Sequence, residues 1–144
     1  MPSPSSSVPP RDTDIRLTLP ARAENVAVVR HVLGALAEAL NLDRAVVDDM
    51  RLAVTEACTN VVRHAYGGSE GTIDVVVRPR GELLEVVITD EGRGLDPSPD
   101  TAGPGLGLAL IEALTHSFEV ERSDHAGSRL VMSFRRRTPS MGMA

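Results

Sequence analysis

A carboxylate and a carboxamide at helical spacing are the first residues of this sequence that could carry out chemistry. Glu56 and Asn60 are four positions apart within residues 52–66, so both lie on one face if that stretch is helical. A carboxylate can accept a proton, and a carboxamide oxygen is a neutral ligand for a hard cation such as Mg²⁺. The pair could serve phosphoryl transfer, although two solvated polar side chains would give the same pattern.

A second group follows a predicted strand, where Asp90 is succeeded by Gly92 and Gly94. Glycine lets the backbone approach a ligand closely, and an ionised aspartate can accept a hydrogen bond from an exocyclic amine. The amino group of adenine suits such an acceptor, whereas the carbonyl of guanine would repel it. The alternative is an ordinary turn made of acidic residues and glycines.

A third group, residues 103–107 with the sequence GPGLG, stands just ahead of a predicted helix. Backbone amides at a helix N-terminus that side chains do not obstruct favour an anion, most often phosphate. No Gly-Lys-Ser/Thr follows, so the group is not a Walker A loop. A proline-rich loop precedes it instead of a strand, which disfavours a dinucleotide-binding motif. Taken alone, the group could equally be a flexible turn.

The hydrophobic pattern predicts the elements that must position these groups. Alternating apolar residues indicate a strand that ends at Pro20, and apolar residues three and four positions apart indicate helices. The helical stripes are predicted to be Val28, Val32, Leu36 and Leu40 in one helix and Val54, Cys58, Val61 and Ala65 in the next. The predicted strands are 15–20, 72–77, 83–89, 118–122 and 129–134, and the predicted helices are 24–40, 43–64 and a short one ending at 114.

The connections between these elements favour one fold class. Asp43 can cap the second helix, residues 78–81 are short enough for a hairpin, and Asp124 and Gly127 suit the turn of the closing hairpin. Strands joined as hairpins imply a mixed, mostly antiparallel sheet. We therefore predict an α+β fold, a two-layer α/β sandwich with three helices covering one face of the sheet.

Length and composition limit the classes of function. The 144 residues suit one domain, predicted at 13–136 between a Pro- and Ser-rich disordered leader, 1–12, and a flexible tail, 137–144. No run of 18 apolar residues and no signal pattern occurs, so we expect a cytoplasmic protein. The net charge of −5 disfavours direct nucleic-acid binding. The one cysteine, Cys58, is predicted to be a small core residue.

The order and spacing of the three groups resemble a known family. Glu56-x-x-x-Asn60, Asp90-x-Gly92-x-Gly94 and Gly105-x-Gly107 resemble the N box and the two glycine boxes of the ATP-binding fold shared by gyrase, a heat-shock chaperone family, histidine kinases and MutL proteins (GHKL). The contexts TEACTNVVRHAY, ITDEGRGL and GLGLALI look like the stand-alone anti-sigma factor serine/threonine kinases of that superfamily. The resemblance covers residues 15–135 and implies the Bergerat ATP-binding fold.

The resemblance also implies roles for individual residues, with ATP and Mg²⁺ as cofactors. Asn60 would coordinate Mg²⁺ that bridges the ATP phosphates, and Glu56 would be the general base for a protein serine or threonine. Asp90 would bind the amino group of adenine. His64 resembles a family histidine with either a capping or a catalytic role. The other nucleotide-binding positions would be Gly92, Gly94, Gly105, Leu106, Gly107 and Ser128.

The partners implied by the resemblance are proteins. Similar proteins form homodimers that sequester a sigma factor and phosphorylate an antagonist of the STAS fold. Helix 24–40 resembles the region of partner contacts, with Arg30 as a candidate contact, although a solvated arginine is the alternative. The segment 96–102 between the glycine groups is short and acidic and leaves only Arg93 as a nearby cation. An ATP-binding module that acts by partner binding alone therefore stays an alternative to a kinase.

Overall fold

A five-stranded sheet forms one layer of the molecule. The computed structural model describes residues 14–65, 70–92, 106–122 and 127–136. The strand order is β1-β2-β3-β5-β4, and every neighbouring pair is antiparallel. The sheet was predicted to be mixed and mostly antiparallel; the described strands pair only in the antiparallel direction, and the α+β class is confirmed. The strands are β1 (Ile15–Pro20), β2 (Thr72–Arg80), β3 (Leu83–Asp90), β4 (Ser117–Arg122) and β5 (Ser128–Arg135).

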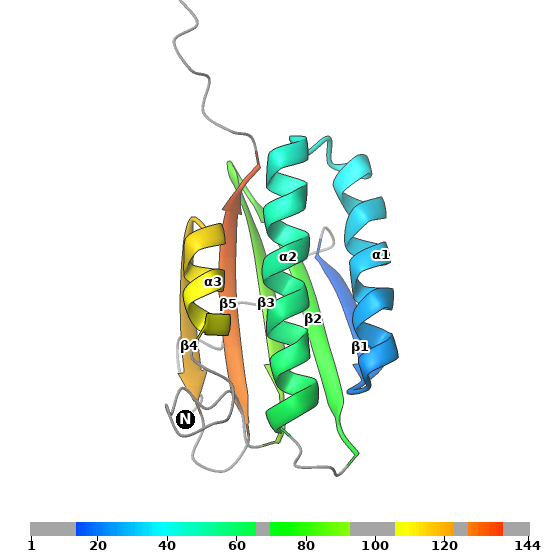
Figure 1. The fold of residues 1–144 in the computed structure, drawn as a ribbon. Helices are drawn as coiled ribbons and strands as arrows, with labels where there is room; N and C mark the ends of the chain where they lie inside the picture. The colour runs from blue at the N-terminus through cyan, green and yellow to red at the C-terminus, as the bar shows by residue number, and fades with distance from the viewer. Residues whose placement is uncertain (1–13, 66–69, 93–105, 123–126, 137–144) are drawn as a thin grey trace, which may run out of the picture.

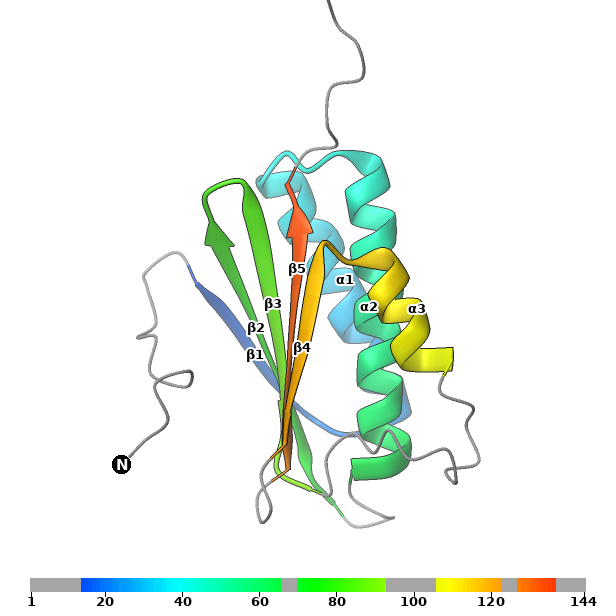
Figure 2. The ribbon, with the colours of Figure 1, turned by 90° about the vertical axis from the view of Figure 1, so that its left-hand side faces the viewer.

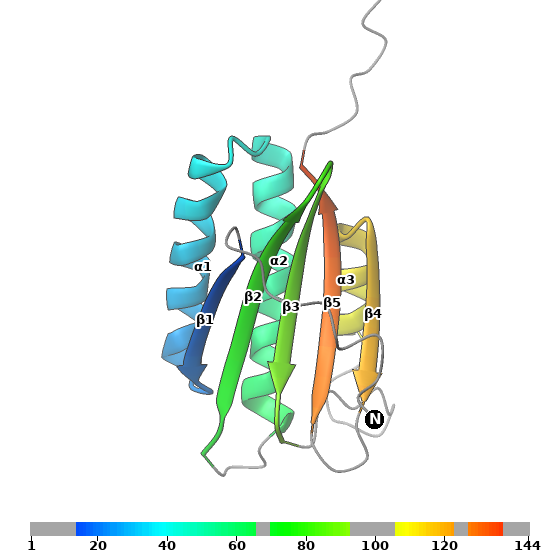
Figure 3. The same cartoon turned by 180° about the vertical axis from the view of Figure 1, so that it is seen from behind.

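Three helices form the second layer, and all lie on the same face of the sheet (Figure 1). They are α1 (Ala23–Ala39), α2 (Arg44–Asn60) and α3 (Leu106–Leu114), with a π-helical turn (Val61–Ala65) that continues α2. The edge-on view in Figure 2 separates the two layers, and Figure 3 shows the other face of the sheet, where no helix of the described segments lies. The predicted two-layer sandwich is therefore confirmed.

Aliphatic side chains fill the space between the layers. Among the described residues the core is built almost entirely from Val, Leu, Ile, Ala and Met, with Phe134 as its one fully buried ring. Val54, Cys58 and Val61 are buried, as predicted for the stripe on α2. No helix in the described part of the chain is long and apolar enough to cross a membrane.

The apolar stripe predicted to be buried on α1 is wrong, because the neighbouring stripe of the same helix faces the core. The buried residues of α1 are Val26, Val29, Leu33 and Ala37, whereas Val28 is 41% exposed. Apolar residues surround most of this helix, so the sequence contains two overlapping stripes. Contact with both α2 and the sheet selects the row that is buried. Leu36 and Leu40 of the predicted stripe lie at the margin of the core.

The hairpin between β2 and β3 is tighter than predicted. The predicted connection, 78–81, lies mostly within β2, because Pro79 pairs with Leu84 and the turn begins at Gly81, whose φ is +61°. β1 pairs only with residues up to Val77, so the outer side of β2 is an edge at Pro79. A proline is tolerated there because none of the described strands needs its missing N–H on that side.

The two ends of α2 also refine the prediction. Asp43 occupies the N-cap position, where its backbone carbonyl accepts from the N–H of Val47, but its side chain makes no capping hydrogen bond. Asn41, with φ of +53°, ends the preceding helix. The predicted helix to residue 64 is α-helical only to Asn60 and then π-helical to Ala65. Such single π-helical turns within α-helices are frequent at functional sites.

Cys58 is expected to resist alkylation in the folded protein. Its side chain is fully buried, and desolvation raises the pKa of the thiol to about 12. The thiol ionises at lower pH in the unfolded chain, so its contribution to stability is lost as the pH rises from about 8.5 toward 12. Iodoacetamide at about pH 8 should label the protein only in denaturant. Rapid labelling of the native protein would contradict the burial.

Candidate functional site

The side chains of Glu56 and Asn60 lie against the first turn of α3. A methyl group at Gly107 would come 2.8 Å from Nδ2 of Asn60 and 3.0 Å from Oε1 of Glu56. A Cβ there would have to displace the ends of these two side chains, so glycine at position 107 lets both stay against the start of α3. The predicted pairing of Glu56 and Asn60 on one face is therefore found, and Gly107 is the third member of the group. Asn60 is half-buried rather than open to bulk solvent.

We expect Gly107→Ala to lower the affinity for Mg-ATP by about tenfold, the equivalent of one displaced hydrogen bond. The new methyl group can be relieved only by movement of the Asn60 and Glu56 side chains, because their ends are its nearest neighbours. Isothermal titration with Mg-ATP measures the change. Gly34→Ala is the matched control, since a Cβ at Gly34 in α1 has no neighbour within 4 Å. Equal affinities for both variants would contradict the placement of the ligand at Gly107.

Asp90 is a buried carboxylate that its neighbours hold in one orientation. It ends β3 with 2% of its surface exposed. Its Oδ2 accepts a hydrogen bond from the hydroxyl of Ser128 at 2.7 Å, and its Oδ1 accepts from the N–H of Gly92 at 3.1 Å. Each carboxylate oxygen keeps a further lone pair for an additional donor. The side chain is therefore a preorganised acceptor at the end of the strand.

Gly127 allows the ends of β3 and β5 to meet. Its φ is +87°, and a Cβ there would lie 2.0 Å from the carbonyl oxygen of Asp90. No other residue fits without moving the strands apart, which would break the pairing of Asp90 with Ser128. The sequence predicted Gly127 only as a turn residue. Its close approach to Asp90 is a tertiary contact that no local pattern signals.

The two groups lie at the same end of the molecule. The C-terminal end of α2, the end of β3 and the start of β5 are all at the lower end of the molecule in Figure 1. In the same view the N-terminus of α3 is at the lower end of that helix. The described residues thus bring together Glu56, Asn60 and Gly107 in one group and Asp90, Gly92 and Ser128 in the other. The first can offer amide and carboxylate oxygens beside a helix N-terminus, and the second offers a fixed hydrogen-bond acceptor.

Several predicted residues cannot be placed in either group. Leu106 opens α3, but its side chain lies outside the description, as does the side chain of His64. Within the described segments, no cluster of three His, Cys, Asp or Glu residues could hold a metal. Outside the described residues lie the leader, the tail, Arg93, Gly94, the segment 96–102, Gly105 and Asp124.

Comparison with known proteins identifies the family of this chain. The sequence matches the family described as "Histidine kinase-like ATPase domain" over residues 19–134. It is 34% identical to the serine-protein kinase RsbW of Halalkalibacterium halodurans, over 83% of this chain and 81% of that protein. It is 31% identical to the serine-protein kinase RsbW of Bacillus cereus, over 74% of this chain and 76% of that protein.

A solved structure shares the fold. The structure of the RsbU and RsbW domains of Rv1364c from Mycobacterium tuberculosis superposes with a TM-score of 0.71 at 23% identity. The match covers 88% of this chain and 33% of that larger chain. The likeness establishes the two-layer architecture around the site.

Proposed function

The chain belongs to the histidine kinase-like ATPase family and, within it, to the RsbW serine-protein kinases, and on that premise we propose that it transfers the γ-phosphate of ATP to a serine of a partner protein. The observation that carries the proposal is the contact of Glu56 and Asn60 with Gly107 at the start of α3. A base, a neutral metal ligand and backbone amides that can receive phosphate form a minimum set for phosphoryl transfer.

In this proposal ATP spans the two groups of residues, with adenine at one and the phosphates at the other. Asp90, fixed by Ser128 and Gly92, accepts from the amino group of adenine. The phosphates lie at the other group, where Gly107 leaves the backbone at the start of α3 unobstructed. The binding roles predicted for Gly94, Gly105 and Leu106 belong to the same proposal. Their backbone would complete the pocket around the nucleotide.

Mg²⁺ fits the donor set as a partner of the nucleotide. The ion usually keeps several waters and takes one or two protein ligands together with phosphate oxygens. The half-buried Asn60 supplies one neutral oxygen, which suits a metal delivered with ATP better than a permanent metal site. When bound, Mg²⁺ neutralises charge on the phosphates.

Glu56 acts on the second substrate. Its carboxylate accepts the proton of the serine hydroxyl as the oxygen attacks the γ-phosphorus, and ADP leaves with the electrons of the broken P–O bond. Asn60, one helical turn further along α2, keeps the phosphate chain in line with the attacking oxygen. Both residues project from a helix packed on the sheet, so the protein needs little reorganisation to reach this geometry.

The biological role that follows is that of an anti-sigma factor in the cytoplasm. It would sequester a sigma factor as a homodimer and phosphorylate an antagonist of the STAS fold. Relatives named serine-protein kinase RsbW support this role. In this scheme phosphorylation of the antagonist resets the switch, because the modified antagonist no longer competes with the sigma factor.

The test uses the full chain, γ-labelled Mg-ATP and a purified STAS-fold antagonist. We expect label on a serine of the antagonist, dependent on Mg²⁺ and abolished by excess unlabelled ATP. If the antagonist binds tightly but takes up no label, the protein is a binding module that acts by occupying its partners. If neither ATP nor the antagonist binds, both functions are wrong.

A further inference from the structure

A groove between α1 and α2 lies away from the Glu56 and Asn60 site. It has a volume of about 860 Å³ and is lined by the C-terminal half of α1, the connection at Asn41 and Leu42, and the first two turns of α2. Figure 1 shows that α1 and α2 are joined at the end of the molecule opposite the end of β3. The groove therefore requires an explanation separate from nucleotide binding.

Three arginines line this groove and form no salt bridge with any acidic residue that the structure describes. Arg30 comes from α1, and Arg44 and Arg51 come from α2. None of the three forms an ion pair within the described segments, whereas the sheet arginines Arg16 and Arg129 each pair with an acidic residue. In a protein with a net charge of −5, the groove thus gathers three arginines against two carboxylates, those of Glu38 and Asp48.

The wall of the groove contains a glycine that the fold itself does not need. Gly34 lies in the interior of α1 and lines the groove, yet a Cβ there would have no neighbour within 4 Å. A helix-interior glycine costs about 1 kcal/mol relative to alanine. No contact within the described residues explains this cost. A ligand that packs closely against α1 at Gly34 would explain why glycine is present there in place of alanine.

The spacing of the arginines indicates the shape of that ligand. Arg44 and Arg51 are seven residues apart, which is about two helical turns or 10 Å along α2. Residues seven positions apart lie on the same face of a helix, so both arginine side chains can meet one ligand. They match two carboxylates at the same spacing on another helix. Leu42 and Val47 give the groove an apolar component, which suits the apolar face of an amphipathic helix.

We propose that the groove between α1 and α2 binds an acidic amphipathic helix of a partner protein. Its apolar ridge lies over Gly34, and its carboxylates pair with Arg44 and Arg51. Glu38 and Asp48 also line the groove. They repel a uniformly anionic ligand such as a nucleic acid and favour a helix that carries some basic residues. This binding does not depend on the kinase activity proposed above.

The probe is a synthetic helix of about five turns with leucine on one face and two glutamates seven residues apart. Its matched counterpart has lysines in place of the glutamates. We expect the acidic helix to bind and to shift the amide NMR signals of α1 and α2 around the groove. Arg44→Glu/Arg51→Glu should weaken its binding by about tenfold or more and allow the lysine helix to bind instead.

Two further variants separate shape from charge. Gly34→Leu fills the notch in α1 and should weaken binding of the acidic helix, whereas Ala39→Leu adds the same side chain outside the groove and should not. Arg135→Glu is the charge control, because Arg135 is an exposed arginine that does not line the groove. Mg-ATP titration of every variant shows whether the nucleotide site is intact, so failure here is distinct from failure of the kinase proposal.

Three outcomes would overturn the inference. The first is equal binding of the acidic and lysine helices by the unmodified protein. The second is binding that survives both Arg44→Glu/Arg51→Glu and Gly34→Leu. The third is complete displacement of the acidic helix by a single-stranded oligonucleotide, which would make the groove a general anion surface.

Discussion

Glu56→Gln is expected to lower the rate of serine phosphorylation by about 10²–10⁴-fold, the usual contribution of a positioned general base. Glutamine keeps the shape of the side chain beside Gly107 but cannot accept the proton of the attacking hydroxyl. ATP affinity should be almost unchanged, since the proposed contacts to adenine and to the phosphates come from other residues. Single-turnover transfer of labelled phosphate, with ATP and antagonist both saturating, measures the chemical step.

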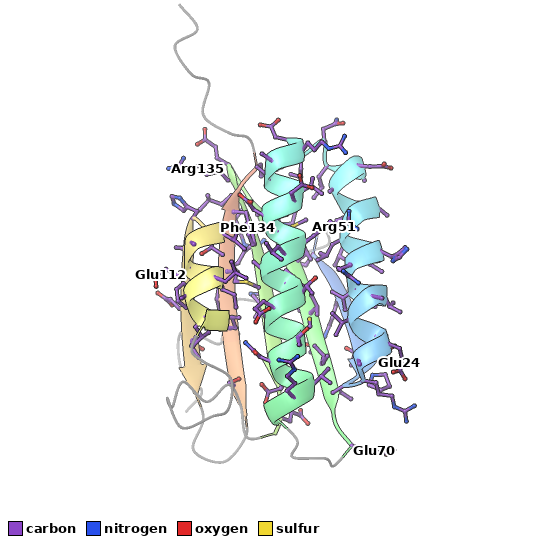
Figure 4. All side chains as sticks on the ribbon, in the orientation of Figure 1. Glu24, Arg51, Glu70, Glu112, Phe134 and Arg135 are labelled. Atoms are coloured by element: carbon purple, nitrogen blue, oxygen red, sulfur yellow. The ribbon has the colours of Figure 1, made fainter. Side chains whose placement is uncertain are left out.

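Glu112→Gln is the matched control for this prediction. Glu112 is an exposed glutamate on α3, and Figure 4 shows it on the side of that helix away from α2. Its replacement removes one negative charge from α3 and leaves the group of Glu56, Asn60 and Gly107 unchanged. A Glu56→Gln protein that phosphorylates as fast as the Glu112→Gln protein would show that Glu56 is not the base.

Asp90→Asn should lower ATP affinity by about 100-fold and lower GTP affinity much less. The buried carboxylate already accepts from Ser128 and Gly92, so the isosteric amide can keep its oxygen toward Gly92 and turn its NH₂ toward Ser128. That NH₂ then faces the amino group of adenine. Both groups are hydrogen-bond donors, so neither finds an acceptor in the other. Such a mismatch in a buried site costs about 1–3 kcal/mol. Titration with both nucleotides measures the change in preference.

The control for this variant is Asp49→Asn, because Asp49 is an exposed aspartate on α2. The melting temperatures of both variants without nucleotide show whether the sheet is intact. If Asp90→Asn melts like the control and still binds ATP with the affinity of the unmodified protein, adenine is not recognised by Asp90.

The order of the elements could be predicted because each one has a strong local pattern. Strand alternation and helical spacing are short-range features, so β1, β3 and α2 were recognised from their own residues. The buried row of α1 could not be chosen in this way, because its sequence contains two apolar stripes. Only the positions of α2 and the sheet decide between them.

The candidate site likewise combines features that a local pattern predicts with features that depend on tertiary packing. Glu56 and Asn60 lie on one helix, so their spacing alone predicted that they act together. The bond between Asp90 and Ser128 joins residues 38 positions apart and depends on the pairing of β3 with β5. The closeness of Gly127 to Asp90 and the groove at Gly34 are likewise products of packing. A local pattern cannot show which distant residues will become neighbours.

The most direct measurement is a crystal structure of the protein with Mg²⁺ and a non-hydrolysable ATP analogue. The account predicts the adenine amino group within hydrogen-bond distance of Asp90, at about 3 Å, and the phosphates between the start of α3 and the Asn60 side chain. It also predicts that Mg²⁺ is bound by Asn60 and phosphate oxygens. A nucleotide bound elsewhere, or bound with Asp90 and Asn60 both out of contact, would contradict it.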